Sequence, residues 1–189
     1  MSLPFRITPV REAEVLRRSA MLNPSEEEKK LMQECRRDGE YLLDYHITER
    51  NRPLSIVEDE RLLGLLKDCG AVIIFTASLG DAFGELVESR DEPEKDIVYQ
   101  GLAAERLDAL VESYLDYKEN TLRESGAVLT PHYAYHWDGV KEDAFTTTRI
   151  CGISFHPQAE TPSRCRTCFV SDCPSRREAP QSQKGQEAP

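Results

Sequence analysis

The sequence lacks the features that would place the protein in a membrane or on a nucleic acid. Its longest apolar run, around residues 71–75, is far too short to span a bilayer. Residues 1–6 do not form the apolar segment of a signal peptide. Basic residues are the minority: 24 lysines and arginines stand against 34 aspartates and glutamates, for a formal net charge of −10. Because this charge repels phosphate backbones and anionic membranes, we expect a cytoplasmic protein with neither a nucleic-acid nor a membrane partner.

The motifs of nucleotide binding and of nucleophilic catalysis are missing as well. The turn at residues 76–80 follows an apolar run and precedes an expected helix, a place where free backbone N–H groups often bind anions. It holds a single glycine, Gly80, so it matches neither the P-loop nor the dinucleotide-binding fingerprint. A tight strand-to-helix turn is the favoured interpretation. No Ser-His-Asp or Cys-His arrangement can be assigned from the sequence.

Cysteine, in contrast, is concentrated near the end of the chain, where Cys165, Cys168 and Cys173 lie close together. A CxxC turn can direct two thiolates at one soft cation, and a third thiolate can occupy another coordination position. The site needs a fourth ligand, for which Cys151 is favoured and His156 is the alternative. In a reducing compartment a metal is favoured over a disulfide. The pattern therefore predicts a zinc or iron–sulfur site, with a cluster of free thiols as the alternative.

Apolar periodicity predicts an α+β fold whose helix-rich N-terminal part surrounds one central strand. Thr8 followed by Pro9 is typical of the start of a first helix, and Asn23 followed by Pro24 of the start of a second. Residues 71–75 are the central strand, because they are apolar and partly β-branched. Further helices are expected at residues 57–69, 81–90 and 94–125, and a connector or short edge strand at residues 46–56.

Strand-like alternation follows the last expected helix. Tyr133, Tyr135 and Trp137 share one face of a predicted strand, and residues 146–155 form a second strand after a turn at 138–139, which together give a small antiparallel sheet. Such aromatic residues are more typical of a core than of a stacking platform, although a flat planar cofactor could stack on them.

His132 and His136 occupy the other face of the same predicted strand. Along a strand they would lie roughly 13 Å apart, which is too far for one metal ion. They are therefore interpreted as surface or ligand-facing residues.

These observations divide the chain into three parts. Residues 1–160 are expected to form the α+β domain, and residues 161–176 a Cys-rich loop that holds the metal or cluster. Residues 177–189 are polar and contain prolines but no large apolar residue, so a disordered tail is expected there.

Three regions resemble a known family, the activation domain of cobalamin-dependent methionine synthase, including stand-alone relatives found beside corrinoid methyltransferases. The likeness spans about residues 10–125. The family's first two helices are resembled by Glu14-Val15-Leu16-Arg17-Arg18 and Asn23-Pro24-Ser25-Glu26-Glu27. Its strand and Thr-x-x-Leu-Gly turn are resembled by Val72-Ile73-Ile74-Phe75-Thr76-Ala77-Ser78-Leu79-Gly80. Its long helix is resembled by Ala103-Ala104-Glu105-Arg106-Leu107-Asp108-Ala109-Leu110.

The resemblance ends at the family's S-adenosylmethionine loop, which follows the long helix. The corresponding residues, 131–139, are shorter and lack its Pro-Gly-Tyr-type motif. No S-adenosylmethionine-binding residue is therefore carried over. The spacing of Cys165, Cys168 and Cys173 is similar to the endings of some short stand-alone members.

The resemblance implies an accessory component of B12-dependent methyl transfer rather than a self-sufficient enzyme. Its partner would be a corrinoid protein or methyltransferase, which carries the cobalamin, and it would dock on that partner to support reductive reactivation. An iron–sulfur centre at the cysteines could pass the electron, whereas a zinc ion would only hold the loop folded. The alternative is a metal-stabilised binding or scaffold protein with no corrinoid link. A thiol redox protein that uses Cys165 and Cys168 is less favoured, because a redox CxxC normally opens a helix after a strand.

Overall fold

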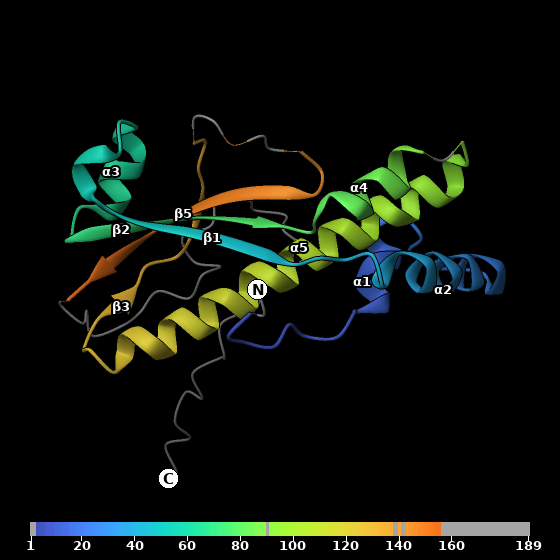
Figure 1. Cartoon of the computed structure of the whole chain (residues 1–189), viewed down its shortest axis with the longest axis horizontal. Helices are drawn as coiled ribbons and strands as arrows, with labels where there is room; N and C mark the ends of the chain where they lie inside the picture. The colour runs from blue at the N-terminus through green and yellow to red at the C-terminus, as the bar shows by residue number, and fades with distance from the viewer. Residues whose placement is uncertain (1–2, 90, 138–139, 141–142, 156–189) are drawn as a thin grey trace, which may run out of the picture.

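An antiparallel sheet organises the fold (Figure 1). The computed structural model describes residues 3–89, 91–137, 140 and 143–155. In this part of the chain the sheet has five strands in the order β1-β2-β5-β3, and β4 also pairs with β5. The strands are β1 (His46–Pro53), β2 (Ala71–Ser78), β3 (Val128–Leu129), β4 (Tyr133–Ala134) and β5 (Thr146–Ser154).

Strand β2 is the buried centre of the sheet, as the sequence predicts. It pairs along its whole length with β1 on one side and β5 on the other. It runs on from the predicted residues 71–75 to Ser78, because β1 and β5 continue to supply partners there. Strand β1 is the edge strand expected within residues 46–56, and it is followed by the 3-10 turn η1 (Leu54–Ile56).

Five α-helices surround this sheet in the described residues, which confirms the predicted α+β class. The long α5 (Pro93–Arg123) crosses beneath the sheet, and α1 (Glu12–Arg18) and α2 (Glu26–Glu40) pack against it (Figure 1). Helix α4 (Asp81–Glu88) follows β2 directly, and α3 (Glu60–Leu66) lies at the end of the sheet opposite α2.

The N-terminal helices begin later than predicted. Helix α1 starts at Glu12, not after Thr8, because the guanidinium group of Arg106 binds the carbonyl oxygens of Thr8 and Pro9 at 2.8 and 3.2 Å. Because these carbonyl oxygens accept hydrogen bonds from α5, they do not accept them within a helical turn.

Helix α2 is capped by Ser25 instead of Asn23. The Ser25 hydroxyl accepts the N–H of Glu28, and the Glu28 carboxylate accepts the N–H of Ser25, so a capping box fixes the first turn. Helix α3 is shorter than residues 57–69, because Asp59 caps it and η1 occupies the preceding residues.

Apolar side chains form two clusters, one on each face of the sheet. The main core lies between the sheet and α5 and includes Phe75, Phe83 and Leu110. The smaller cluster on the opposite face contains Val57, Leu66, Val72, Ile74 and Ile150, with Tyr133, Tyr135 and Trp137 packed against it. Each face of the central strand is therefore covered by a different set of elements.

The boundaries of the predicted Cys-rich loop at 161–176 and tail at 177–189 lie outside the described residues, as does His156. The division of the chain into three parts stays a prediction.

Candidate functional site

The candidate site lies on the face of the sheet opposite α5, around Trp137. Two hollows meet at this side chain, one over β1 and β2 and the other beside α3. We call this surface the Trp137 face. Its residues are Thr48, Arg50, Ile56, Glu58, Asp59, Leu62, Ile74, Thr76, Ala134, Tyr135, His136, Trp137 and Val140.

Strand alternation places the polar residues of β1 and β2 on this face. Thr48 pairs with Thr76, which in turn pairs with Thr148 of β5, so three threonines form a row across the sheet. The hydroxyl oxygens of Thr76 and Thr148 are 3.2 Å apart. The intervening residue Glu49 points to the other face, where its carboxylate accepts the Tyr114 hydroxyl at 2.6 Å.

The first hollow has a volume of ≈ 160 Å³ and combines hydroxyl, cationic and aromatic groups. Thr48, Thr76 and Ile74 contribute from the sheet, while Arg50 and Trp137 stand beside them. The Arg50 guanidinium carbon lies 6.0 Å from the centre of the Trp137 ring, at the limit of a cation–π contact. The hollow thus offers hydrogen-bond donors next to an aromatic surface.

The second hollow, which we call the acidic hollow, is larger, ≈ 630 Å³, and its lining contains two carboxylates together with the His136 imidazole. Glu58 and Asp59 lie on one side, at the start of α3, and Tyr135, His136 and Trp137 on the other. The Asp59 carboxylate is held in place because it accepts the N–H groups of Arg61 and Leu62 at 2.8 and 2.9 Å. The ring centres of Tyr135 and Trp137 are 6.1 Å apart and their planes are tilted by 44°; we call this neighbouring pair the aromatic ledge.

The predicted strand around the aromatic residues is only partly formed. Tyr133 and Ala134 pair with Ile150 and Arg149, and the Tyr135 N–H reaches the Thr148 carbonyl oxygen at 3.3 Å. The aromatic residues do pack against the smaller cluster, as the core interpretation predicts. Trp137 also forms a wall of both hollows.

The two histidines behave differently in the structure. His136 is exposed and lines the acidic hollow, whereas His132 is half-buried and outside both hollows. Within the described residues, no group of three or more His, Cys, Asp or Glu side chains is arranged to hold a metal ion.

Of the four predicted metal ligands, the structure describes only Cys151. Its side chain is fully buried in the main core, with Sγ 3.9 Å from the Ile73 carbonyl oxygen. The choice between Cys151 and His156 as the fourth ligand stays a prediction, because His156 lies outside the described residues. Cys165, Cys168, Cys173 and His156 lie outside the described residues, so the zinc or iron–sulfur site remains a prediction.

Cys35 and Cys69 are buried thiols that form no disulfide bond within the described residues, and their apolar sequence surroundings indicate this burial. Burial raises the pKa of the Cys69 thiol, and the nearby Asp68 charge raises it further. A raised pKa disfavours the reactive thiolate, so this cysteine is best explained as a packing residue.

The buried carboxylate of Glu105 is also explained without a catalytic role. Burial alone would raise its pKa, but hydrogen bonds and charge from Arg106 and Arg11 outweigh burial and hold the pKa below its usual value. The cluster joins α5 to the segment before α1, because Arg106 also binds the Thr8 and Pro9 carbonyls.

The polar residues of the Trp137 face were not identified as site residues from the sequence. Thr48 and Arg50 alternate with residues of the opposite face, and assigning β1 as a full strand would have revealed that pattern. Glu58 and Asp59 carry no comparable signal, because only the fold brings the start of α3 beside Trp137.

Comparison with known proteins adds no family: no protein-family model and no curated protein matches the chain. In the part of the chain that the structure describes, none of the helices is both long enough and apolar enough to cross a membrane.

Proposed function

We propose that the protein is an accessory component of cobalamin-dependent methyl transfer, which docks on a corrinoid protein and supports its reductive reactivation. The observation that carries this proposal is the Trp137 face, where an aromatic ledge lies between two polar hollows. The family-like segments noted in the sequence support the same function.

The Trp137 face suits a flat macrocycle with polar groups at its rim. Trp137 supplies an aromatic surface for contact with a planar ring, and the Tyr135 ring, tilted by 44° from it, can contact the edge of that ring. A corrinoid carries amide side chains around its ring, which both donate and accept hydrogen bonds. Arg50 and Thr48 can donate to amide oxygens from one hollow, and Glu58 can accept from amide N–H groups in the other.

In this proposal the chemistry belongs to the corrinoid, and the protein supplies orientation and exclusion of water. An iron–sulfur centre at Cys165, Cys168 and Cys173 would add an electron-transfer route, whereas a zinc ion there would be structural. Docking through the Trp137 face does not depend on which of the two is bound.

The direct test is a binding titration with a corrinoid protein from the same organism, prepared with cobalt oxidised and with cobalt reduced. Trp137→Ala is expected to weaken binding by at least about tenfold, because truncating a central aromatic residue at an interface has effects of this size. Arg50→Ala should weaken binding less, and because Arg50 is exposed it leaves the fold intact.

The matched control is Tyr41→Ala, which removes another aromatic residue that is 76% exposed at the end of α2, away from the Trp137 face. Its affinity should equal that of wild type. Failure of the wild-type protein to bind in both cobalt states, or equal binding by Trp137→Ala with its fold verified by circular dichroism, would contradict the proposal.

A further inference from the structure

A second surface, at the other end of the molecule, has the properties of a docking site. We propose that the groove between α2 and the start of α5 binds a basic amphipathic helix of a partner protein. The groove has a volume of ≈ 760 Å³. We call it the acidic groove, and the residues used below are Met21, Leu31 and Ile97 as its apolar part and Glu27, Glu34 and Glu94 as its acidic part.

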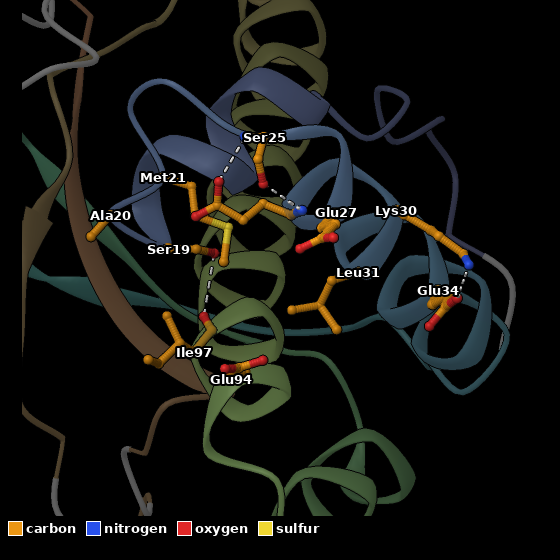
Figure 2. Close-up of a pocket in the computed structure, with 11 residues that line it drawn as sticks. Ser19, Ala20, Met21, Ser25, Glu27, Lys30, Leu31, Glu34, Glu94 and Ile97 are labelled. Atoms are coloured by element: carbon orange, nitrogen blue, oxygen red, sulfur yellow. Dashed lines mark hydrogen bonds and ion pairs between the residues drawn. The ribbon is translucent and has the colours of Figure 1, made fainter.

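The apolar part of the acidic groove is unusually open to solvent. Ile97 is 50% exposed although it lies on α5, whose other apolar residues are largely buried. Leu22, the neighbour of Met21, is 75% exposed. Ile97 and Leu22 are two of the four large hydrophobic side chains that are exposed among the described residues, and Ile97 lines the groove. Figure 2 shows Met21 and Leu31 reaching into the space between the α1–α2 connection, α2 and α5. An apolar strip of this kind is the usual floor of a helix-binding groove.

The charged residues of the groove determine the sign of the charge that a partner must carry. Its lining contains four carboxylates, from Glu27, Glu28, Glu34 and Glu94, and one ammonium group, from Lys30, which leaves a net charge of −3. Figure 2 shows Glu27 and Glu94 bordering the space into which Leu31 points. A basic partner is therefore attracted and an acidic one is repelled.

Helix capping explains only part of this arrangement. Glu27, Glu28 and Glu94 lie in the first turns of α2 and α5, where negative charge is favoured. Glu34, in the middle of α2, pairs with Lys30 one turn away at 4.0 Å, and capping does not account for the exposed Ile97. A basic amphipathic helix has an apolar face that matches the apolar strip and positive charges that match the carboxylates around it.

The groove is also preformed. The Ser19 hydroxyl donates to the Val15 carbonyl oxygen at 2.9 Å and lies 3.3 Å from the Ile97 carbonyl oxygen, so the end of α1 is held on α5. Ala20 takes a left-handed conformation with φ 61°, which turns the chain toward α2. A rigid groove lowers the ordering cost of binding. The acidic groove is distinct from the Trp137 face, because α2 and α3 lie at opposite ends of the sheet (Figure 1).

The test uses a fluorescein-labelled helical peptide of leucine and lysine with one apolar face, and fluorescence anisotropy as the readout. Ile97→Asp should weaken binding at least about tenfold, because it places a charge in the apolar strip. The double variant Glu27→Gln/Glu94→Gln should weaken binding at least about fivefold and reduce its salt dependence.

A matched control, Glu60→Gln/Glu124→Gln, distinguishes binding at the acidic groove from binding driven by the total charge of the protein. It removes two exposed carboxylates elsewhere in the molecule. This control should bind the peptide within about twofold of wild type. Equal binding by all variants, or no binding by wild type, would overturn the proposal. A wild-type dimer in sedimentation that Ile97→Asp dissociates would also overturn it, since the groove would then be an interface between copies of this chain.

Discussion

At the scale of single residues, the described structure places its buried charges where they fasten the N-terminal segment to α5. Glu105 is fully buried and contacts both Arg11 and Arg106, and Arg106 is itself almost fully buried. The segment before α1 has no regular secondary structure. Its attachment therefore depends on a few side chains whose loss leaves an uncompensated charge.

Arg106→Met should be strongly destabilising for this reason. The variant leaves the Glu105 carboxylate with only Arg11 and removes two hydrogen bonds to the Thr8 and Pro9 carbonyls. We expect the free energy of unfolding to fall by about 3–5 kcal/mol, the usual cost of breaking a buried ion pair. Urea denaturation measures it. Arg37→Met is the control, because Arg37 is exposed and pairs only with the adjacent Asp38, and a loss of similar size there would refute the explanation.

Glu14 gives the fold a predictable dependence on pH. Hydrogen bonds from Arg17 and Arg18, with the charges of both, outweigh the raising effect of burial and together lower its pKa to about 2. Since the folded pKa lies below the ordinary value of 4.5, the stabilisation is complete above that value and is lost as the pH falls toward 2. Glu14→Gln should lower the melting temperature at about pH 7 and have progressively less effect at about pH 3 and below. A difference from wild type that is constant over this range would show that Glu14 is not responsible.

At the scale of secondary-structure elements, close packing of α1 on α5 depends on Gly101. A Cβ at this position would meet the Ser19 hydroxyl and lie 2.9 Å from the Val15 carbonyl oxygen. Gly64 in α3 provides the contrast, because a Cβ there would meet nothing within 4 Å. The two glycines thus differ in packing although both lie inside helices.

Alanine at these two positions should therefore have opposite effects. Gly101→Ala is expected to lower the free energy of unfolding by about 1–3 kcal/mol, since the backbone of α1 must move. Gly64→Ala should raise it by about 0.5–1 kcal/mol through helix propensity alone. Urea denaturation of both variants checks the pair, and stabilisation by both would mean that α1 is not packed on α5 as described.

Local sequence patterns predicted the strong elements and missed those set by distant contacts. The long periodic stripe predicted α5 to within two residues at each end, because its apolar residues are the ones that the helix buries. The apolar run predicted the start of β2 but ended three residues before the strand does, at Ser78. The start of α1 was missed because Arg106, far away in the sequence, binds the carbonyls of Thr8 and Pro9. The site was missed in the same way: Trp137 was noted as an aromatic residue, but its neighbours Glu58 and Thr76 come from other elements.

At the scale of the whole molecule, we expect the predicted Cys-rich loop at residues 161–176 to be separable from the described core. Among the described residues, the main core is built from the sheet and α5. Cys168→Ser should therefore release the zinc or iron–sulfur centre and leave the helical circular dichroism signal unchanged. Metal analysis and the visible absorption spectrum of protein purified without oxygen are the measurements. Wild type with no stoichiometric metal, or full retention of metal by Cys168→Ser, would refute the predicted site.

The Trp137 face and the acidic groove lie at different parts of one fold and carry different chemistry. The Trp137 face is aromatic and flanked by both charge signs, whereas the acidic groove is apolar with a negative rim. In our account the first surface meets the corrinoid and the second meets a basic helix. A variant of one surface should therefore leave binding at the other unchanged.

The central proposal is tested most directly by the rate at which an oxidised corrinoid protein returns to its active state. The oxidised protein is supplied with titanium(III) citrate and a methyl donor, with and without this chain, and the cobalt absorption bands are followed. Our account predicts that wild type and Tyr41→Ala accelerate the return and that Trp137→Ala, although folded, accelerates it at least about tenfold less. An unchanged rate with wild-type protein present, or equal acceleration by Trp137→Ala, would contradict it.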